Sequence, residues 1–278
     1  MRILLTGGHG QLGRALQQAL ADQTLIVTDL DTLDITDKAA VLAAVTDSAP
    51  DLVIHAAAYT NVDGCTRDPA LALRVNGLGA HHVALACQAA GCELVHISTN
   101  EVFPGDAPAG YTEWMARRAI NSYGRSKLAA EQFVERTLNR YYIVRLAWLF
   151  APGGHNFIHA IRQRAASGQP LRVVADEIGN PTYAQDLAAA IAQLIQTGQY
   201  GIYHLVNEGA CSRWAFANEI LRLTGLTGIV NQPILSRDYQ RASTPPLFGA
   251  LQNIQGAALG IRLRPWQEAL AAYLENEG

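Results

Sequence analysis

A tyrosine and a lysine four residues apart give the clearest chemical signal in the sequence. Tyr123 and Lys127 form a YxxxK pattern within the segment YGRSK. Residues i and i+4 share one face of a helix, so the phenol and the ammonium reach the same site. A free phenol has a pKa of about 10, and a fixed cation beside it is expected to lower that pKa. We therefore expect Tyr123 to donate a proton to a carbonyl oxygen, with Lys127 as its partner.

Two hydroxyl residues, Ser98 and Thr99, directly follow the apolar run Leu94–Ile97. Ligands of open α/β sheets bind at the carboxyl ends of the strands, so a hydroxyl there reaches the carbonyl beside Tyr123. Serine and threonine also favour turns and helix caps for purely structural reasons. We favour the catalytic role, because Tyr123 follows at a suitable distance along the chain.

A glycine-rich turn follows the first apolar strand and opens a helix. The segment TGGHGQLG fits GxGxxG through Gly8, Gly10 and Gly13, and it fits TGxxGxxG when Gly7 replaces Gly8. Glycines permit the tight turn and the close approach of a pyrophosphate, and the helix N-terminus supplies N–H donors. The pattern predicts a dinucleotide-binding site.

An acidic residue lies at the distance that such a site requires. Asp29 closes the second apolar strand, about 20 residues after the glycines, where a carboxylate accepts from a ribose 2′-hydroxyl. A carboxylate there repels a 2′-phosphate, and neither Leu30 nor Asp31 offers a cation to hold one. The cofactor is therefore expected to be NADH or NADPH, with Asp29 favouring NADH.

Short apolar runs alternate with helical patterns over the first two-thirds of the chain. This alternation predicts βαβ units and a parallel sheet, and continuous apolar strands indicate a sheet covered on both faces. The predicted fold is α/β, with a Rossmann-type doubly wound parallel sheet. The expected strands are Ile3–Leu5, Leu25–Val27, Leu52–Ile54, Leu94–Ile97 and Tyr142–Leu146, and the expected helices are Gln11–Ala21, Ala39–Val45, Leu71–Ala90 and Ser122–Leu138.

The pattern loosens after Trp148, which predicts a smaller mixed C-terminal substrate-binding lobe. Residues 1–150 are expected to form a dinucleotide-binding domain, and 151–278 mainly the substrate-binding lobe. Residues 182–200 are expected to return to the first domain, because Leu187–Ile195 is strongly apolar. The lobe should hold helices at 157–166, 186–195 and 214–223 and strands at 171–174 and 204–206, with an irregular stretch at 231–248.

Charge and hydropathy exclude two classes of binding partner, nucleic acid and membrane. The net charge is −3 and the Lys and Arg residues are scattered, whereas a nucleic-acid binder would show a basic stripe. The first apolar run is shorter than the roughly 7–15 residues of a signal peptide, and no stretch approaches the roughly 20 apolar residues of a membrane span. We therefore expect a cytoplasmic protein that binds neither nucleic acid nor membrane. The cysteines and histidines lack metal-ligand spacing, so no metal site is predicted.

Eight blocks in order resemble the extended short-chain dehydrogenase/reductases, and most closely the dTDP-4-dehydrorhamnose reductases among them. The match runs from Met1 to about Ala272. The resemblance implies NADH- or NADPH-dependent reduction of the C4 ketone of a dTDP-4-keto-6-deoxy sugar, dTDP-4-dehydrorhamnose to dTDP-L-rhamnose. Mg²⁺ and a homodimer are implied by this resemblance only, and not by any residue pattern. The blocks are TGGHGQLG, LDITD, HAAAYTNVD, RVNGLGA, ISTNEVF, YGRSKLAAE, RLAWLF and IGNPTYAQDLA.

The same resemblance implies roles for individual residues. Tyr123 would be the proton donor, Lys127 its partner and a ribose binder, and Thr99 the third catalytic residue. Both Tyr123 and Lys127 would also contact the cofactor. Asn76 would help to hold the active-site backbone. The expected cofactor contacts are Gly7, Gly10, Gln11 and Leu12 at the pyrophosphate, Asp29 at the ribose, Asp34 and Ile35 near the adenine, and Ala56, Ala57 and Ala58 along the channel.

Substrate contacts are expected at Thr60, Glu101 and Trp148, although Trp148 is also suited to a core aromatic position. Four departures from the family pattern fall in this half, one of them Ala119, where a proline is common. Glu101 replaces the aromatic residue of the usual STDYVF block, Ala151-Pro152 replaces a glycine, and Ala242–Pro245 lacks an expected arginine. Because of these departures, the substrate is either this sugar nucleotide or another keto-sugar nucleotide.

Two other functions fit the same blocks. The first is an epimerase or dehydratase of another nucleotide sugar, which would retain NAD through the reaction. Asn100-Glu101 is half of the Asp-Glu pair that dehydratases commonly carry. The second is a non-catalytic regulatory subunit that binds a dinucleotide, like the one that accompanies methionine adenosyltransferase. The intact Tyr123 and Lys127 pair argues against a purely regulatory role.

Overall fold

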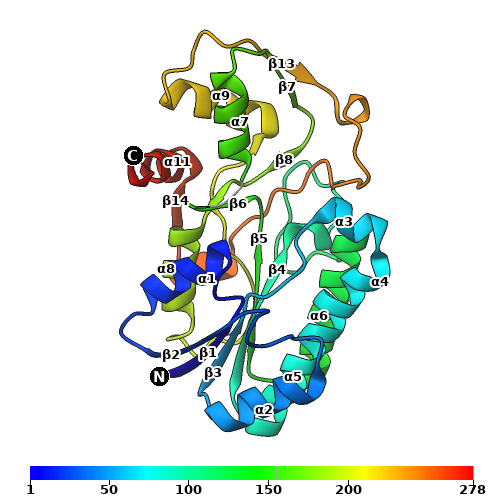
Figure 1. Cartoon of the computed structure of the whole chain (residues 1–278), viewed down its shortest axis with the longest axis vertical. Coiled ribbons are helices and arrows are strands. Elements are labelled where there is room, and N and C mark those ends of the chain that lie inside the picture. The colour runs from blue at the N-terminus through cyan, green and yellow to red at the C-terminus, as the bar shows by residue number, and fades with distance from the viewer. Residues whose placement is uncertain (154–155, 278) are drawn as a thin grey trace.

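A six-stranded parallel sheet lies at the centre of the computed structural model, which describes residues 1–153 and 156–277 (Figure 1). The strand order is β10-β5-β4-β3-β1-β2, and every pairing is parallel. Continuous apolar runs form the inner strands, because both faces of the sheet are covered. The strands are β1 (Arg2–Thr6), β2 (Thr24–Thr28), β3 (Leu52–His55), β4 (Glu93–Thr99), β5 (Tyr141–Leu146) and β10 (Gly201–His204).

Helices cover both faces of this sheet, as a doubly wound fold requires (Figure 1). One face carries α1 (Gln11–Ala19) and α8 (Ala184–Leu194), and the other carries α2 (Lys38–Ser48), α5 (Gly79–Ala90) and α6 (Ser122–Thr137). The predicted α/β doubly wound fold is confirmed.

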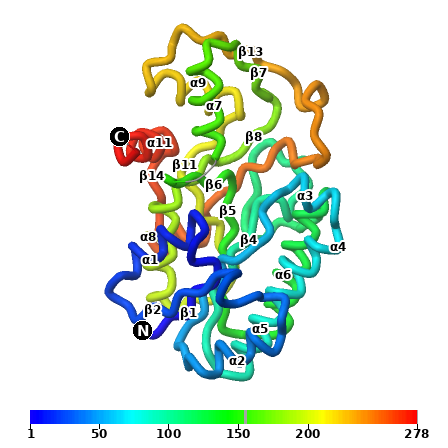
Figure 2. The backbone as a smooth tube through the Cα atoms, viewed as in Figure 1, coloured from blue at the N-terminus to red at the C-terminus, as the bar shows by residue number. Residues whose placement is uncertain are grey.

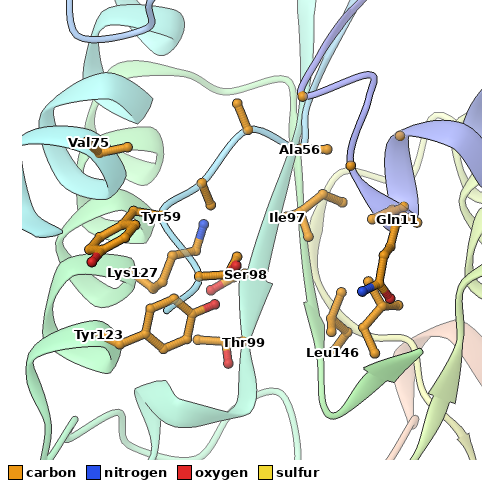
Figure 3. A pocket seen from close by; sticks show the side chains of 18 of the residues that line it. Gln11, Ala56, Tyr59, Val75, Ile97, Ser98, Thr99, Tyr123, Lys127 and Leu146 are labelled. Carbon is orange, nitrogen blue, oxygen red and sulfur yellow. The ribbon is translucent and has the colours of Figure 1, made fainter. Parts of the chain in front are cut away.

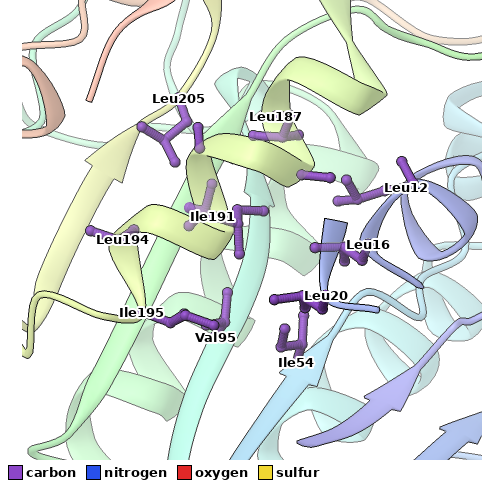
Figure 4. Close-up of a cluster of buried hydrophobic side chains, with 14 of the residues drawn as sticks. Leu12, Leu16, Leu20, Ile54, Val95, Leu187, Ile191, Leu194, Ile195 and Leu205 are labelled. Carbon is purple, nitrogen blue, oxygen red and sulfur yellow. The ribbon is translucent and has the colours of Figure 1, made fainter. Parts of the chain in front are cut away.

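The packing between α1 and α8 explains why this part of the chain lies against the sheet. Leu16 and Leu20 of the first helical segment face Ile191 of α8 over Ile54 and other sheet residues (Figure 4). Burying one leucine or isoleucine of this kind contributes roughly 1.5–3 kcal/mol. The periodic apolar positions of both helices therefore fix them on the same face.

The order of the strands creates a crevice. The chain runs from β1 outward to β2 and then crosses back to β3 on the other side of β1. Connections leave β1 and β3 in opposite directions, so a gap opens at their carboxyl ends, where ligands of such sheets bind.

A second lobe lies beyond the carboxyl ends of the strands (Figures 1 and 2). Its core contains stacked aromatic rings, with Phe150 at 5.4 Å from Tyr183 and Phe216 edge-on to Trp266 at 5.6 Å. The tube in Figure 2 shows the chain leaving the sheet after β5, returning with α8 and β10, and leaving again.

Short elements complete this lobe and the loops of the sheet. The helices are α3 (Val62–Arg67), α4 (Pro69–Ala72), α7 (Phe157–Ala166), α9 (Arg213–Leu223), α10 (Gln255–Ala258) and α11 (Trp266–Asn276), with 3-10 turns at Asn100–Val102 and Ser236–Asp238. The strands are β6 (Leu149–Phe150), β7 (Leu171–Val174), β8 (Ile178–Gly179), β9 (Thr182–Tyr183), β11 (Asn207–Glu208), β12 (Cys211–Ser212), β13 (Asn231–Ile234) and β14 (Leu263–Pro265).

Three local expectations need correction. The stretch 231–248 is not wholly irregular, because β13 pairs with β7 and carries Pro233; a proline fits a strand whose other edge is unpaired. The strand expected at 204–206 is Gly201–His204. The helix expected at Leu71–Ala90 is interrupted by a π-helical turn, Leu73–Leu78. Among the described residues, no helix has both the length and the apolar character needed to cross a membrane.

Candidate active site

One cavity of about 920 Å³ opens at the carboxyl ends of the central strands. Its volume lies near the upper limit of the roughly 300–1,000 Å³ found for ligand pockets. Every residue predicted as a site residue lines it. These are Gly7, Gly10, Gln11, Leu12, Asp29, Asp34, Ile35, Ala56, Ala57, Ala58, Thr60, Thr99, Glu101, Tyr123, Lys127 and Trp148.

The glycine turn after β1 forms a cradle that only a backbone without side chains can make. Gly7 has a φ of +75°, and a Cβ atom there would lie 2.5 Å from the amide nitrogen of Ala57. A Cβ on Gly13 would lie 2.1 Å from the carbonyl oxygen of Gly7. Helix α1 then begins at Gln11 with Gly10 as an N-cap that has no side chain to cap the first amides. This cradle fits a dinucleotide pyrophosphate, because no side chain caps the first-turn N–H groups, which leaves them available to an anion.

Acidic residues lie at the far end of this cradle. Asp29 accepts from the amides of His9 at 2.7 Å and Leu30 at 2.8 Å. Ligand atoms of His9, Asp29 and Asp31 lie within 4.8 Å of one another. Exposed clusters of this kind are common without an ion, and we assign no metal to it. Asp34 accepts from the amide and hydroxyl of Thr36, and the backbone bond lowers the pKa of this carboxyl.

Asn76 holds the loop after β3 against the helix that carries the YxxxK pattern. Its side chain accepts from the amide of Tyr59 at 2.7 Å and donates to the carbonyl of Tyr59 at 3.0 Å. It also donates to the hydroxyl of Ser126 at 3.0 Å. The π-helical turn contains Asn76, and such turns are frequent at functional sites. The expectation that Asn76 holds the site backbone is confirmed.

Helix α6 presents the two reactive side chains. Figure 3 shows Tyr123 and Lys127 projecting from α6 into the cavity, with Thr99 beside the phenol and Gln11 on the opposite wall. Asn121 caps the helix by accepting from the amide of Gly124 at 2.8 Å. A Cβ on Gly124 would lie 2.1 Å from the carbonyl oxygen of Glu101. This glycine therefore lets the start of α6 pack directly on the loop after β4.

The pKa of the Tyr123 phenol is raised, which corrects the expectation that a cation would lower it. Burial is the largest cause, the charge of Glu101 adds to it, and a hydrogen bond with Thr99 lowers the pKa only in part. Burial disfavours the phenolate, and the depth of burial of Tyr123 could not be predicted from local sequence. Tyr123 is therefore protonated at neutral pH and suited to donate a proton.

Lys127 occupies a buried position next to two histidines. Its ammonium nitrogen lies 3.4 Å from Nε2 of His96, and His55 contacts the hydroxyl of Thr6 at 2.7 Å. Burial lowers the pKa of Lys127 to about 8, although the charge of Glu131 opposes this shift. Burial, followed by the charge of Lys127, lowers the pKa of His55 to about 3 and that of His96 well below its usual value. Both imidazoles are therefore neutral, and Lys127 carries the positive charge.

Glu131, one further turn along α6, anchors the strands beneath the site. Its carboxylate accepts two bonds of 2.8 Å from Arg145, one of 2.8 Å from Arg117 and one of 2.5 Å from Ser98. Burial alone would raise the pKa of Glu131, but the bonds from Arg145 and its charge lower it overall. The Ser98 hydroxyl is thus committed to Glu131. Thr99 is the hydroxyl that interacts with Tyr123.

The other end of the cavity is formed by aromatic and charged side chains. Trp148 has a φ of +45°, a left-handed conformation that is costly for a bulky residue and often occurs at functional sites. Its ring lies over Gly179, where a Cβ would approach to 2.6 Å. The guanidinium of Arg213 stacks on this ring, 3.8 Å from its centre. Trp148 is therefore a cavity residue as well as a packed one.

Sequence reasoning missed several cavity residues, of which Arg213 is the most important. It is the first residue of α9 and reaches the cavity because β12, directly before it, pairs with β8. No motif surrounds it in the sequence. Arg14, Tyr59, Val62, Leu71 and Val75 also line the cavity. Of these, Tyr59 directly precedes a predicted residue, which could have indicated it.

The class of the protein follows from three features. These are the doubly wound parallel sheet, the glycine cradle at its switch point, and the Tyr-Lys-Thr group in the same cavity. The protein is a Rossmann-type oxidoreductase of the extended short-chain dehydrogenase/reductase class. The family described as "RmlD substrate binding domain" matches residues 1–278. The chain belongs to this family.

Relatives of known name cover nearly the whole chain. The spore coat polysaccharide biosynthesis protein SpsK of Bacillus subtilis is 36% identical, over 99% of this chain and 97% of that protein. A dTDP-4-dehydrorhamnose reductase of Streptomyces griseus is 39% identical, over 97% of this chain and 91% of that protein.

Solved structures agree with this placement. The crystal structure of a dTDP-4-dehydrorhamnose reductase from Bacillus anthracis in complex with NADP is 37% identical, with a TM-score of 0.96 over 99% of both chains. A Thermus thermophilus UDP-glucose 4-epimerase in complex with NAD is 24% identical over 100% of this chain and 99% of that one, with a TM-score of 0.84. The second likeness bears on the fold alone.

Proposed function

We propose that this protein reduces the C4 ketone of a dTDP-4-keto-6-deoxy sugar, converting dTDP-4-dehydrorhamnose to dTDP-L-rhamnose with NADPH or NADH. The observation that carries the proposal is the position of Tyr123, Lys127 and Thr99 in one cavity with the glycine cradle. Named relatives that act as dTDP-4-dehydrorhamnose reductases support it.

The reaction adds a hydride to the ketone carbon and a proton to its oxygen. The nicotinamide cofactor supplies the hydride when it is bound. Tyr123, which burial keeps protonated, donates the proton from its hydroxyl to the ketone oxygen. Thr99 hydrogen-bonds the phenol and orients it, and the Lys127 ammonium stabilises the negative charge that develops nearby.

We assign the two ligands to the two ends of the cavity. Gly7, Gly10, Gln11 and Leu12 would hold the pyrophosphate, Asp29 the ribose, and Asp34 and Ile35 the adenine, with Ala56–Ala58 along the channel. Thr60, Glu101 and Trp148 would contact the sugar nucleotide. Both NADPH and NADH are retained as reductants, because the Bacillus anthracis relative was crystallised with NADP while Asp29 favours NADH. Mg²⁺ stays an implication of the family resemblance.

The test is a cofactor-oxidation assay with a panel of keto-sugar nucleotides. The purified protein should consume NADPH or NADH only when a dTDP-4-keto-6-deoxy sugar is present. Tyr123→Phe should lower kcat by about 10²–10⁴-fold, the usual contribution of a positioned proton donor. Tyr200→Phe is the matched control, because its hydroxyl bonds Glu93 at the amino end of the sheet, away from the cavity.

Three results would contradict the proposal. A cofactor that co-purifies and is never consumed would indicate an epimerase or dehydratase. Cofactor binding without turnover, together with a stable protein partner, would indicate a regulatory subunit. Full activity of Tyr123→Phe would remove the phenol from the mechanism.

The proposed function extends to the localisation of the enzyme, the roles of its domains and its oligomeric state. We infer a cytoplasmic enzyme in which residues 1–150 and 182–200 bind the dinucleotide and 151–278 mainly bind the substrate. A homodimer is part of the proposal, and light scattering of the purified protein would test it: a mass near 59.8 kDa, twice the 29.9 kDa of the chain, is expected.

A further inference from the structure

Four charged residues form a wall at the substrate end of the cavity. Glu101 follows β4, Glu177 precedes β8, Arg213 begins α9, and Arg241 lies in the loop after β13. Each of them acts electrostatically on others of the group. We call these residues the charged wall. Two acids and two bases leave it without net charge.

The outer part of the wall is paired. Arg241 hydrogen-bonds the carboxylate of Glu177. Neither residue lines the cavity. Arg213 reaches the same carboxylate only at 3.9 Å, which is an ion pair and not a hydrogen bond.

The inner part of the wall has unused hydrogen-bonding groups. Arg213 lines the cavity, and its side chain donates no hydrogen bond to any described residue, although a guanidinium carries five N–H donors. Glu101 accepts from Asn121 at 2.6 Å through one oxygen, Oε2. Its second oxygen has no hydrogen-bond partner in the described parts of the chain.

Arg213 and Glu101 attract each other across the cavity without touching. Each is among the charges that shift the pKa of the other. Within residues 1–153 and 156–277, however, no ion pair of 4.0 Å or less joins them. Both side chains line the cavity, so a gap of more than 4.0 Å separates this donor from this acceptor.

The chemistry of the gap selects what can fill it. An apolar group would leave buried donors and acceptors unpaired, which is unfavourable. An anion would meet the carboxylate of Glu101 within a wall of zero net charge. A hydroxyl satisfies both sides, because its hydrogen bonds the carboxylate while its oxygen accepts from the guanidinium.

The position of the gap relative to Thr99 and Tyr123 indicates which hydroxyl of the sugar would fill it. The backbone amide of Glu101 donates to the Thr99 hydroxyl at 3.2 Å. The side-chain charge of Glu101 also acts on the Tyr123 phenol. The group that binds there is thus close to the reacting ketone. In a 4-keto-6-deoxyhexose, C3 is the carbon next to the ketone that carries a hydroxyl, since C5 carries the methyl group.

We propose that Arg213 and Glu101 form a clamp for the C3 hydroxyl of the keto sugar, which makes Arg213 a specificity-determining residue. This inference rests on the proposed function for the identity of the sugar. Arg213 donates to the hydroxyl oxygen, and Glu101 accepts its hydrogen.

Calorimetric binding tests the clamp without turnover. The probes are dTDP-L-rhamnose, its 3-deoxy analogue and dTDP, each added to the protein with NADPH. The natural protein should bind the hydroxylated sugar about 10- to 100-fold more tightly than the deoxy analogue, as expected for two charge-assisted bonds. In Arg213→Leu and in Glu101→Leu this preference should fall to about threefold or less.

A double variant, Glu177→Gln with Arg241→Leu, is the matched control. It removes the outer pair, which does not line the cavity, and should keep the preference for the hydroxylated sugar. NADPH affinity and circular dichroism of each variant establish that the fold is intact.

Four outcomes would overturn the clamp. These are equal binding of both sugars by the natural protein, a full preference in Arg213→Leu, the absence of binding of either sugar, and an equal loss of affinity for dTDP in Arg213→Leu. The last would make Arg213 a phosphate ligand. Failure of the proposed function is separate, because it appears as a lack of cofactor oxidation by a protein that still prefers the hydroxylated sugar.

Discussion

At the cofactor end of the cavity, Gly7 and Gly13 leave no room for a Cβ atom, whereas at the substrate end Glu101 and Arg213 face the cavity with charge. The glycine cradle at the cofactor end consists of backbone amides and small residues that are neighbours in the sequence. The substrate end combines side chains from distant segments. Backbone geometry suits a ligand part that never changes, such as a pyrophosphate, whereas side chains can be exchanged to suit a particular sugar.

The largest expected effect concerns Glu131, which bonds Ser98 of β4 and Arg145 of β5 between the two ends of the comparison. Glu131→Gln leaves the buried guanidinium of Arg145 without its ionic partner. Losing one partner of a buried pair costs about 3–5 kcal/mol, so the free energy of unfolding should fall by that amount. Urea denaturation measures it.

Glu135→Gln is the control for this variant. Glu135 bonds the same Arg117 but is partly exposed, so its loss should cost about 1 kcal/mol or less. An equal loss in both variants would show that Glu131 has no special position beneath the site.

The second prediction isolates the close approach at the cofactor end. Gly7→Ala and Gly91→Ala both place a side chain at a left-handed φ, +75° and +69°, but nothing lies within 4 Å of a Cβ on Gly91. Gly91→Ala should lose about 1 kcal/mol of stability from its φ alone, and Gly7→Ala should lose more, because its Cβ also meets the backbone of Ala57. Only Gly7→Ala should also weaken NADPH binding, by about 10- to 100-fold, because the cradle must shift. Fluorescence titration measures this, and similar NADPH affinities for the two variants would argue against the cradle.

The third prediction concerns the choice of cofactor. Asp29→Asn keeps an acceptor for the His9 amide but removes the charge that repels a 2′-phosphate. The ratio of NADPH to NADH affinity should rise about tenfold, equivalent to ~1.4 kcal/mol of repulsion. Asp22→Asn, at the surface after α1, should leave the ratio unchanged. An unchanged ratio in Asp29→Asn would remove this carboxylate from cofactor selection.

The smallest expected effect is a pH dependence at the junction of the two ends. The pKa of Lys127 is lowered to about 8, so its ammonium is present below that pH and is lost as the pH rises through it. Between pH 7 and 8.5 kcat/KM for NADPH should fall about fourfold, since it reports the free enzyme. Lys127→Met should have a low and flat profile over this range. A natural protein with an equally flat profile would contradict the role of this ammonium.

The same comparison explains what the sequence could predict. Strand and helix periods, the glycine turn and the YxxxK spacing are local, so the sheet and the positions of Gly7, Tyr123 and Lys127 followed from short patterns. Arg213 was missed because a strand pairing brings it to the cavity from a distant segment. The predicted direction of the pKa shift of the Tyr123 phenol was wrong, because burial depends on the tertiary structure.

The return of the chain to the sheet through α8 and β10 has a consequence for chimeric enzymes. A fragment that ends at residue 150 would leave β5 as an open edge and uncover the apolar side of α1. Exchanging sugar selectivity between homologues therefore requires two grafted inserts, one on each side of α8 and β10, and a single junction would separate partners that hold each other in place.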